Sequence, residues 1–333
     1  MTVILSRDSE LYLSTVDVDF TEETTTKLRL LDGYKMTQGS QINSYSTFRN
    51  AVAPSRVETK YVKDLDLVSL EFDTYCKTSL YGGVAESSDY LLWDSFTNHG
   101  LTKNATKMEI DFLSSSTNIF PTLFIYVVMD NDVFKLSDCY VESATLPIDI
   151  NGIAKVSWSI KALTYEKVAS APNVYKDRTE VTGLLKTRLS VMEFNRQTQD
   201  YHLPLLSGSV TIKNDIVMLS TPVVYAQLAE NRRIRVEARS VNGTISAYLR
   251  TGKARSFGLL ESMLTSIATI NDLTNITINI GGLTGRRVAI NLPQTIISLP
   301  AINLRDVVAV DINLLPVETG IGQNDDITIE YYN

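Results

Sequence analysis

Histidine, cysteine and tryptophan are scarce in this chain of 333 residues, which contains two of each. His99 and His202 lie in unrelated positions, and no H-x-x-x-H spacing or Cys/His cluster accompanies them, which argues against a zinc site. No G-x-S-x-G motif offers either histidine a nucleophile to activate. Cys76 and Cys139 lie far apart and outside any C-x-x-C, so we expect reduced thiols. The sequence therefore predicts no catalytic residue, metal or cofactor.

Long apolar runs are also missing. No stretch approaches the roughly 20 consecutive apolar residues of a membrane-spanning helix. Residues 1–14 lack the layout of a signal peptide. The apolar fraction of 44% and the charged fraction of 21% are those of an ordinary globular protein. We therefore expect a protein that folds in a cytoplasm and does not insert into a membrane.

A basic excess is absent as well, since the net charge at pH 7 is −7. Residues 1–170 hold 15 basic and 23 acidic residues (−8), and residues 171–333 hold 16 and 15 (+1). Binding of nucleic acid through its phosphates requires a basic face, so this distribution argues against a nucleic-acid-binding protein. It remains compatible with a surface along which nucleic acid passes without sticking.

One segment occurs twice in the chain. Ser298–Glu318 repeats Thr145–Glu166 with one gap. In the first copy Val156, Trp158 and Ile160 alternate with polar residues, which predicts a long half-buried strand. The matched positions are Leu146-Pro147 with Leu299-Pro300, Val156, Trp158 and Ile160 with Val308, Val310 and Ile312, and Leu163 and Glu166 with Leu315 and Glu318.

Further segments match in the same order, so we interpret the chain as a tandem duplication. Each half predicts a hairpin, a loop, a strand, a helix, a strand, a hairpin and a long strand. The matched helices are Ser87–Gly100 and Arg255–Ile267, with Leu91-Leu92 on Leu259-Leu260, and Met108–Ser114 matches Ile276–Gly282. The predicted fold is mainly β, a sandwich or partly closed barrel with one flanking helix per domain. We place domain 1 at residues 1–170, a linker at 171–186 and domain 2 at 187–333.

The two halves differ most at a polar segment, Thr37–Asp66, because its counterpart Lys213–Arg233 is shorter. It has no helical period and only weak strand character. A connection of this length is usually a protruding loop or a long hairpin arm that contacts partners.

Several charged groups have both a structural and a functional interpretation. Glu71 and Asp73, like Glu109 and Asp111, are spaced two apart on predicted strands, which places each pair on one solvent-facing side. Catalytic carboxylates are the less favoured interpretation. The basic segment Arg232–Arg239 is interpreted as a solvated strand face, with a nucleic-acid contact as the alternative. Because Arg235 and Arg239 match Ser69 and Asp73, they are also candidates for charge pairs between neighbouring domains or subunits.

The segment Leu136–Glu166, with the preceding YLLWDSF helix and MEIDF strand, resembles bacteriophage tail tube proteins. Its features are a strand that ends in a small-residue turn, a glycine-containing turn and a long alternating strand. Typical members carry one such domain, and a fused pair is similar to the major tail proteins of T-five-like siphophages. Those relatives carry an additional C-terminal immunoglobulin-like domain, which we do not expect after Tyr331-Tyr332-Asn333.

The resemblance implies a structural virion protein without enzymatic activity. Trimeric, pseudo-hexameric rings would stack into a tube, and double-stranded DNA would pass through it without specific binding. Further implied partners are the tape measure protein, the tail terminator and the baseplate or tip proteins, with assembly in the host cytoplasm. By the same analogy the residues 37–66 would make ring-to-ring contacts. Candidates for lining the lumen are Glu71, Asp73, Glu109 and Asp111.

Two alternatives stay open at this point. A single-ring component, such as a baseplate hub, a tail terminator or a related injection-system protein, would use the same fold. A carbohydrate-binding tail-tip protein would need exposed aromatic residues. Trp93 and Trp158 both fall on predicted core faces, which argues against the second alternative.

Overall fold

A computed structural model describes residues 9–45, 59–112, 120–130, 132–179, 184–196, 199–220, 232–252, 254–265, 273–298, 301–303 and 309–333. In the first half the strands are β1 (Ser9–Ser14), β2 (Thr25–Leu28), β3 (Leu31–Tyr45), β4 (Thr59–Tyr75), β5 (Thr78–Tyr81), β6 (Val84–Ser87), β7 (Leu101–Lys103), β8 (Lys107–Asp111), β9 (Leu123–Met129), β10 (Asp132–Asp149) and β11 (Lys155–Val168). Then follow β12 (Lys176–Asp177), β13 (Val191–Arg196), β14 (Gln199–Leu203), β15 (Leu205–Ser220), β16 (Arg232–Tyr248), β17 (Thr274–Ile280), β18 (Arg287–Ile297), β19 (Ala301–Asn303), β20 (Ala309–Pro316) and β21 (Thr328–Tyr332). The helices are α1 (Tyr90–Thr97) and α2 (Ser256–Thr265), with a 3₁₀ turn at Thr187–Leu189. The mainly β fold expected from the sequence is therefore confirmed.

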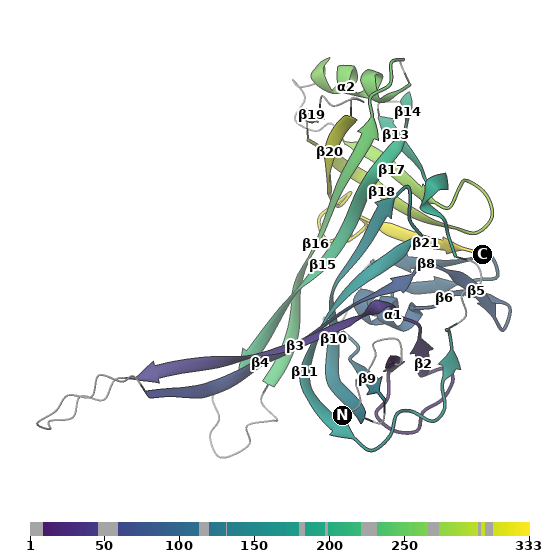
Figure 1. The fold of residues 1–333 in the computed structure, drawn as a ribbon. Coiled ribbons are helices and arrows are strands. Elements are labelled where there is room, and N and C mark those ends of the chain that lie inside the picture. Colours follow the sequence, from purple (N-terminus) through teal and green to yellow (C-terminus); the bar gives the residue numbers. More distant parts are fainter. Residues whose placement is uncertain are drawn as a thin grey trace, which may run out of the picture.

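One antiparallel sheet runs through both halves of the chain, and we call it the central sheet. Its strands follow the order β3, β4, β11, β10, β15, β16 and β20 (Figure 1). β10 makes this continuity possible because it is long. Its first part pairs with β9, and its last part, Ser143–Asp149, pairs with Ser207–Lys213 of β15. We call this pairing the β10–β15 junction.

A second sheet covers the apolar side of the central sheet. Its strands follow the order β14, β13, β17, β18, β21, β8 and β7. β21 connects the halves because it pairs with β18 on one side and with β8 of the first half on the other. Apolar side chains of both sheets join one continuous core. Strand pairs therefore cross the boundary between residues 1–170 and 187–333 in both sheets.

The same set of strand pairings occurs in both halves. In the first half the pairs are β1–β2, β1–β9, β9–β10, β10–β11, β11–β4 and β4–β3. In the second half they are β13–β14, β13–β17, β17–β18, β18–β20, β20–β16 and β16–β15. β17 thus occupies the position in the second half that β9 occupies in the first half. β8 instead pairs with β7 and β21. The predicted match of Met108–Ser114 with Ile276–Gly282 is therefore wrong, since β-strand alternation alone does not specify a partner.

The paired strands do not form a closed barrel. Within the described residues the pairings branch at β10, β18 and β20, and no series of paired strands returns to its first strand. Both sheets instead face each other across the core, which is the sandwich alternative of the sequence analysis.

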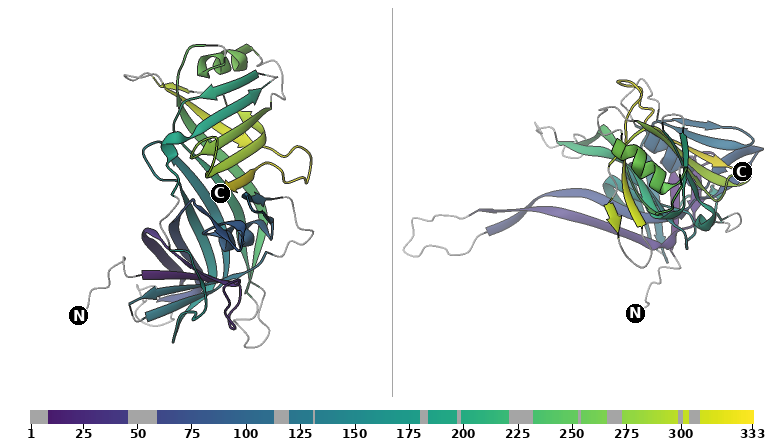
Figure 2. Two further views of the ribbon diagram at one scale, coloured as in Figure 1. Left: turned by 90° about the vertical axis from the view of Figure 1, so that its right-hand side faces the viewer. Right: turned by 90° about the horizontal axis from the view of Figure 1, so that it is seen from above.

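Two hairpin arms project from this body. β3 and β4 stay paired as far as Tyr45 and Thr59, and β15 and β16 stay paired as far as Ser220 and Arg232 (Figures 1 and 2). The segment 37–66 is thus largely a hairpin arm, the second of the two forms expected for it. Its residues 46–58 lie outside the described part of the chain.

Helix α1 lies between the sheets and is almost completely buried. Asp89 precedes its first residue, and Asn98 ends it in the left-handed conformation, so the helix is shorter than the predicted range 87–100. Trp93 is fully buried and meets the ring of Trp158 edge-on at 4.8 Å. Both tryptophans lie in the core as predicted. No helix among the described residues is long and apolar enough to cross a membrane.

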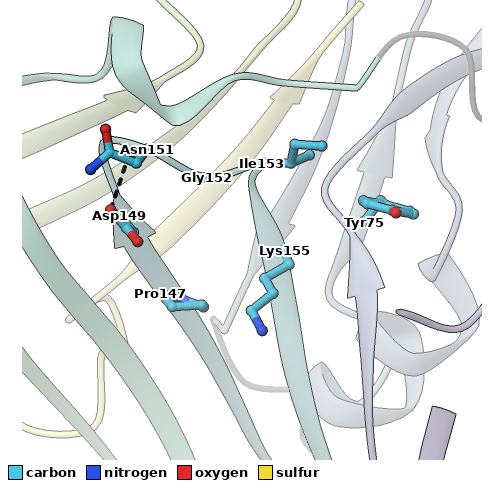
Figure 3. A pocket seen from close by; sticks show the side chains of 7 residues that line it. All are labelled: Tyr75, Pro147, Asp149, Asn151, Gly152, Ile153 and Lys155. Atoms are coloured by element: carbon cyan, nitrogen blue, oxygen red, sulfur yellow. Dashed lines mark hydrogen bonds between the residues drawn. The ribbon is translucent and has the colours of Figure 1, made fainter. Parts of the chain in front are cut away.

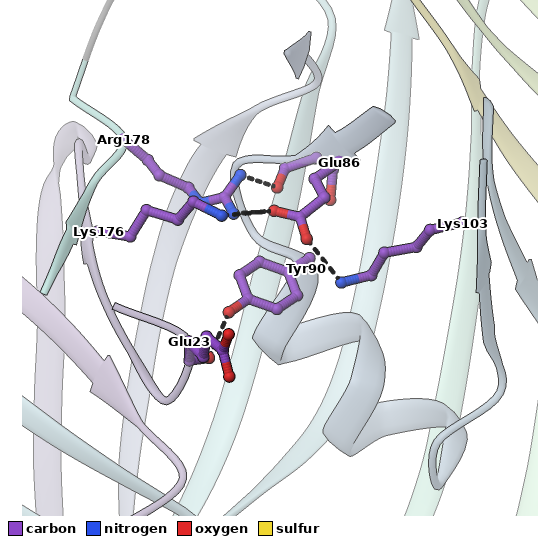
Figure 4. Close-up of polar contacts among 7 residues, drawn as sticks. Glu23, Glu86, Tyr90, Lys103, Lys176 and Arg178 are labelled. Atoms are coloured by element: carbon purple, nitrogen blue, oxygen red, sulfur yellow. Dashed lines mark hydrogen bonds and ion pairs between the residues drawn. The ribbon is translucent and has the colours of Figure 1, made fainter. Parts of the chain in front are cut away.

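The described part of the predicted linker 171–186 is bound to the first half. β12 pairs with β2, and the fully buried Arg178 side chain donates hydrogen bonds to Glu86 and to the carbonyl oxygen of Ser87 (Figure 4). Lys103 also contacts Glu86, at 2.9 Å. Burial alone would raise the pKa of Glu86, but the hydrogen bonds from Lys103 and Arg178 and their charges lower it to about 2. The linker is therefore anchored by a buried, charge-assisted cluster.

Candidate functional site

The outer face of the central sheet is polar across both halves. Ser157 and Ser159 point away from the core because they alternate with the buried residues Val156, Trp158 and Ile160. Neighbouring strands repeat this alternation. The other hydroxyl-bearing positions of this face include Thr37, Ser69, Ser143, Thr145, Ser207, Ser209, Thr211, Ser240, Thr244 and Ser246. We call this surface the hydroxyl face.

Hydrogen bonds connect side chains of the hydroxyl face from strand to strand. At the β10–β15 junction the hydroxyls of Thr145 and Thr211 lie 3.1 Å apart. The hydroxyls of Ser209 and Thr244 lie 3.2 Å apart on the next pair of strands. Such cross-strand pairs fix the side chains in a polar lattice that continues over the boundary between the halves.

Several charges on the hydroxyl face occur as ion pairs, whereas Lys213, which lies opposite Ser143 on the same face, is outside these pairs. Asp73 contacts Lys155 on the adjacent strand. Glu142 lies 3.4 Å from Lys161, and the half-exposed Glu71 lies 3.6 Å from Lys35. The two predicted acids, Glu71 and Asp73, therefore lie on this face, but each has a lysine beside it. The sequence contained a signal for these lysines, because Lys155 and Lys161 occupy the same alternating positions as Ser157 and Ser159.

Glu109 and Asp111 lie on the other side of the molecule. Both belong to β8 of the second sheet, where the intervening Ile110 is buried in the core. Lys107 forms ion pairs with Glu109, at 2.7 Å, and with Glu330 on the paired strand β21. The core therefore separates Glu109 and Asp111 from Glu71 and Asp73, and which of these residues line a lumen stays a prediction.

Arg239 connects the two halves of the chain. Its guanidinium forms an ion pair with Asp326 and stacks 4.6 Å from the ring centroid of Phe112. It also donates a hydrogen bond of 3.5 Å to the carbonyl oxygen of Phe112, a residue of the first half. Arg239 thus contacts both halves within one chain, and a role between subunits stays a prediction.

Arg235 does not lie where the repeat predicted it. Its backbone pairs with Val217 in the arm part of β16, whereas Ser69 pairs with Lys161 in the body of the central sheet. β16 pairs with β20 only over Gly243–Tyr248. The predicted equivalence of Arg235 and Ser69 is therefore wrong, because the short similarity did not fix the register of the longer strand.

An open pocket of ≈ 400 Å³ lies at the end of the central sheet, beside the β10–β11 turn (Figure 3). Its charged groups already have partners: Lys155 pairs with Asp73, and Asp149 accepts a hydrogen bond of 3.0 Å from the backbone of Asn151. No group of three histidine, cysteine, aspartate or glutamate residues in the described ranges is placed to hold a metal ion. The pocket is therefore an open hollow at the end of the sheet whose charged side chains are bound to neighbouring residues.

Comparison with known proteins gives one similarity that spans nearly the whole chain. No family model matches the sequence. The chain is 21% identical over 349 aligned residues to the tail tube protein pb6 of Escherichia phage T5, in an alignment that covers 98% of this chain and 75% of pb6. The chain is therefore a relative of a T5 tail tube protein, which confirms the resemblance that the segment Leu136–Glu166 indicated.

Proposed function

We propose that this chain is a structural subunit of a bacteriophage tail tube. Its similarity to pb6 supports the role, and the central sheet supplies the geometry for it. This sheet passes through both halves and ends on β3 at one side and on β18 and β19 at the other. In the described part of the chain, neither β3 nor β19 has a strand on its outer side. Unpaired edges of this kind are templates for pairing with another chain.

The β10–β15 junction suggests how neighbouring chains join. The recurrence of the strand pairings supports a tandem duplication, in which β3 corresponds to β15, and β18 with β19 corresponds to β10. Pairing of β3 with the β18–β19 edge of the next chain would continue the sheet and remove both edges. A head-to-tail interface closes into a ring when its rotation permits. Three chains then form a pseudo-hexameric ring, and stacked rings form a tube.

The hydroxyl face lines the conduit of this tube. Its hydroxyl groups bind one another and water, and three of its lysines, Lys161, Lys155 and Lys35, are neutralised by Glu142, Asp73 and Glu71. Phosphate binding requires cations that release counterions on contact, and lysines already paired with carboxylates offer little of this. Double-stranded DNA therefore passes over a nearly neutral, hydrated surface without specific binding. Glu109 and Asp111 lie on the outer side of the tube wall.

Within the virion the partners of the tube are further copies of the chain, the tape measure protein, the tail terminator and the baseplate or tip proteins. Assembly takes place in the host cytoplasm, without membrane insertion and without a catalytic step. The segment 37–66, which contains the β3–β4 arm, contacts the adjacent ring.

Electron microscopy of the purified protein tests the proposal. We expect hollow tubes built of six-lobed rings, with three chains in each ring. Single closed rings that never stack would instead identify a baseplate hub, a tail terminator or a related single-ring component. A stable monomer that does not polymerise under any condition would overturn the proposal.

A further inference from the structure

Helix α2 carries an apolar stripe that its own chain leaves exposed. Phe257 is 47% exposed and Leu264 is 55% exposed. They are seven residues apart, which places them two turns apart on one helix face. In the aligned position of Leu264, helix α1 carries Phe96, which is 1% exposed. The two helices thus differ in what covers them.

Helix α1 is covered in part by the base of the β15–β16 arm. Asn214, on β15 just beyond the β10–β15 junction, donates a hydrogen bond of 3.4 Å to the carbonyl oxygen of Phe96. Arg239, on the paired strand, lies over the ring of Phe112. Phe112 in turn meets Phe96 edge-on at 5.9 Å. The intrachain junction therefore has two parts, a strand pairing and an arm that lies against a helix.

The opposite end of the folded molecule presents the complementary surfaces of such a junction. Helix α2 and strand β19 lie at the same end of the molecule, as both views agree (Figures 1 and 2). Ile296 and Leu315 form a cross-strand pair close to this edge, and each is 46% exposed. Exposed apolar groups next to an unpaired strand edge are typical of an interface.

We propose that helix α2 binds the base of the β3–β4 arm of a second copy of this chain. A copy whose β3 continues the central sheet at the β18–β19 edge would carry its arm across α2, as β15–β16 crosses α1. Leu65, on the arm part of β4, is 47% exposed and offers an apolar contact for Phe257 and Leu264. This assignment rests on the proposed tube function and adds the surface that receives the arm.

The surface fits a second copy better than an unrelated partner. The arm, the helix and the two strand edges all belong to this chain, and the intrachain junction already combines their counterparts. Such a contact is heterologous, with different surfaces on the two copies, as a ring requires.

Charge substitution on α2 tests the proposal. The variants Phe257→Asp and Leu264→Asp change exposed side chains, so thermal unfolding of the single chain should stay unchanged. Sedimentation measures the assembly of these variants. Assembly should require a protein concentration at least about tenfold higher than for the unaltered chain, because the interface loses apolar contacts. The matched control is Leu283→Asp, since Leu283 is 56% exposed in the turn after β17. This control should assemble as the unaltered chain does.

Cross-linking supplies a second measurement. Chains with Leu65→Cys are mixed with chains with Leu264→Cys, assembled, and treated with a short bis-maleimide. Cys76 and Cys139 are fully buried and should not react. We expect a cross-linked dimer of one chain of each type, and none when Leu283→Cys replaces Leu264→Cys. Normal tubes with no cross-link and no effect of the α2 substitutions would overturn this inference and leave the tube function standing. Absence of assembly by the unaltered chain would overturn both.

Discussion

The indole nitrogen of Trp93 donates a hydrogen bond of 3.2 Å to the hydroxyl oxygen of Tyr331, 238 residues later in the chain. Both side chains are fully buried. Trp93 belongs to α1 of the first half, and Tyr331 belongs to β21, which pairs with strands of both halves. The core of the first half is therefore completed by a strand of the second half.

Removal of this hydroxyl group should destabilise the protein. Tyr331→Phe keeps the ring but leaves the Trp93 N–H buried without its acceptor, which costs about 1–3 kcal/mol of unfolding free energy. Urea denaturation measures the loss. Tyr165→Phe is the control, because Tyr165 is 43% exposed, and its change should stay within about 0.5 kcal/mol. Equal losses for both variants would show that the buried hydrogen bond contributes nothing.

Acid should weaken the linker cluster. The pKa of Glu86 is about 2 in the folded chain, below its ordinary value of 4.5. A lowered pKa means that the unfolded chain takes up the proton first. The contribution of Glu86 is therefore fully present above pH ~4.5 and is lost as the pH falls toward 2, by on the order of 1–2 kcal/mol between pH 7 and pH 3. The decrease in unfolding free energy from pH 7 to pH 3 should be larger for the unaltered chain than for Glu86→Gln. Parallel curves would contradict the prediction.

The ion pair between Arg239 and Asp326 should behave as a coupled unit. Asp326 is 8% exposed, so Arg239→Ala leaves a buried carboxylate without its partner and should cost roughly 3–5 kcal/mol. Asp326→Ala removes that carboxylate, so the double variant should lose less than the two single losses combined. Chemical denaturation of the four proteins gives the coupling energy. Strict additivity would mean that the pair is not energetically coupled.

Charge reversal distinguishes the two faces of the tube wall. Glu71→Lys adds a free cation to the hydroxyl face, and Glu109→Lys adds one to the second sheet. We expect tubes from both variants but slower, more salt-dependent DNA release only from phages with Glu71→Lys, because a lumenal cation binds phosphates. DNA release at low and high salt is the measurement. Slower release only for Glu109→Lys would place the lumen on the other sheet.

Local patterns in the sequence predicted the strands better than their partners. The alternation around Trp158 and Phe72 correctly predicts which side of β11 and β4 lies in the core. Both helices were expected, and α2 at Ser256–Thr265 differs little from the predicted range 255–267. These features depend on neighbouring residues, whose spacing the sequence displays directly.

Pairings between distant segments could not be predicted in the same way. Nothing local to Thr328–Tyr332 indicates that it pairs with β8, because its alternation fits any sheet edge. The ion pairs of the hydroxyl face depend likewise on the registers of β3 with β4 and of β4 with β11. Bulges near Leu31 and Gln38 shift the register of β3 with β4, and a sequence pattern does not locate such bulges.

During synthesis, β21 emerges long after the helix and the strand that it covers, α1 and β8. A ribosome adds about 5–20 residues per second, so Trp93 waits on the order of ten seconds or more for Tyr331 to be made. During this interval the edge of β8 and part of the α1 surface lack their cover. A nascent chain interrupted before β21 would keep both surfaces open to chaperones and proteases. A chain truncated before β21 therefore lacks the strand that completes the core of the first half.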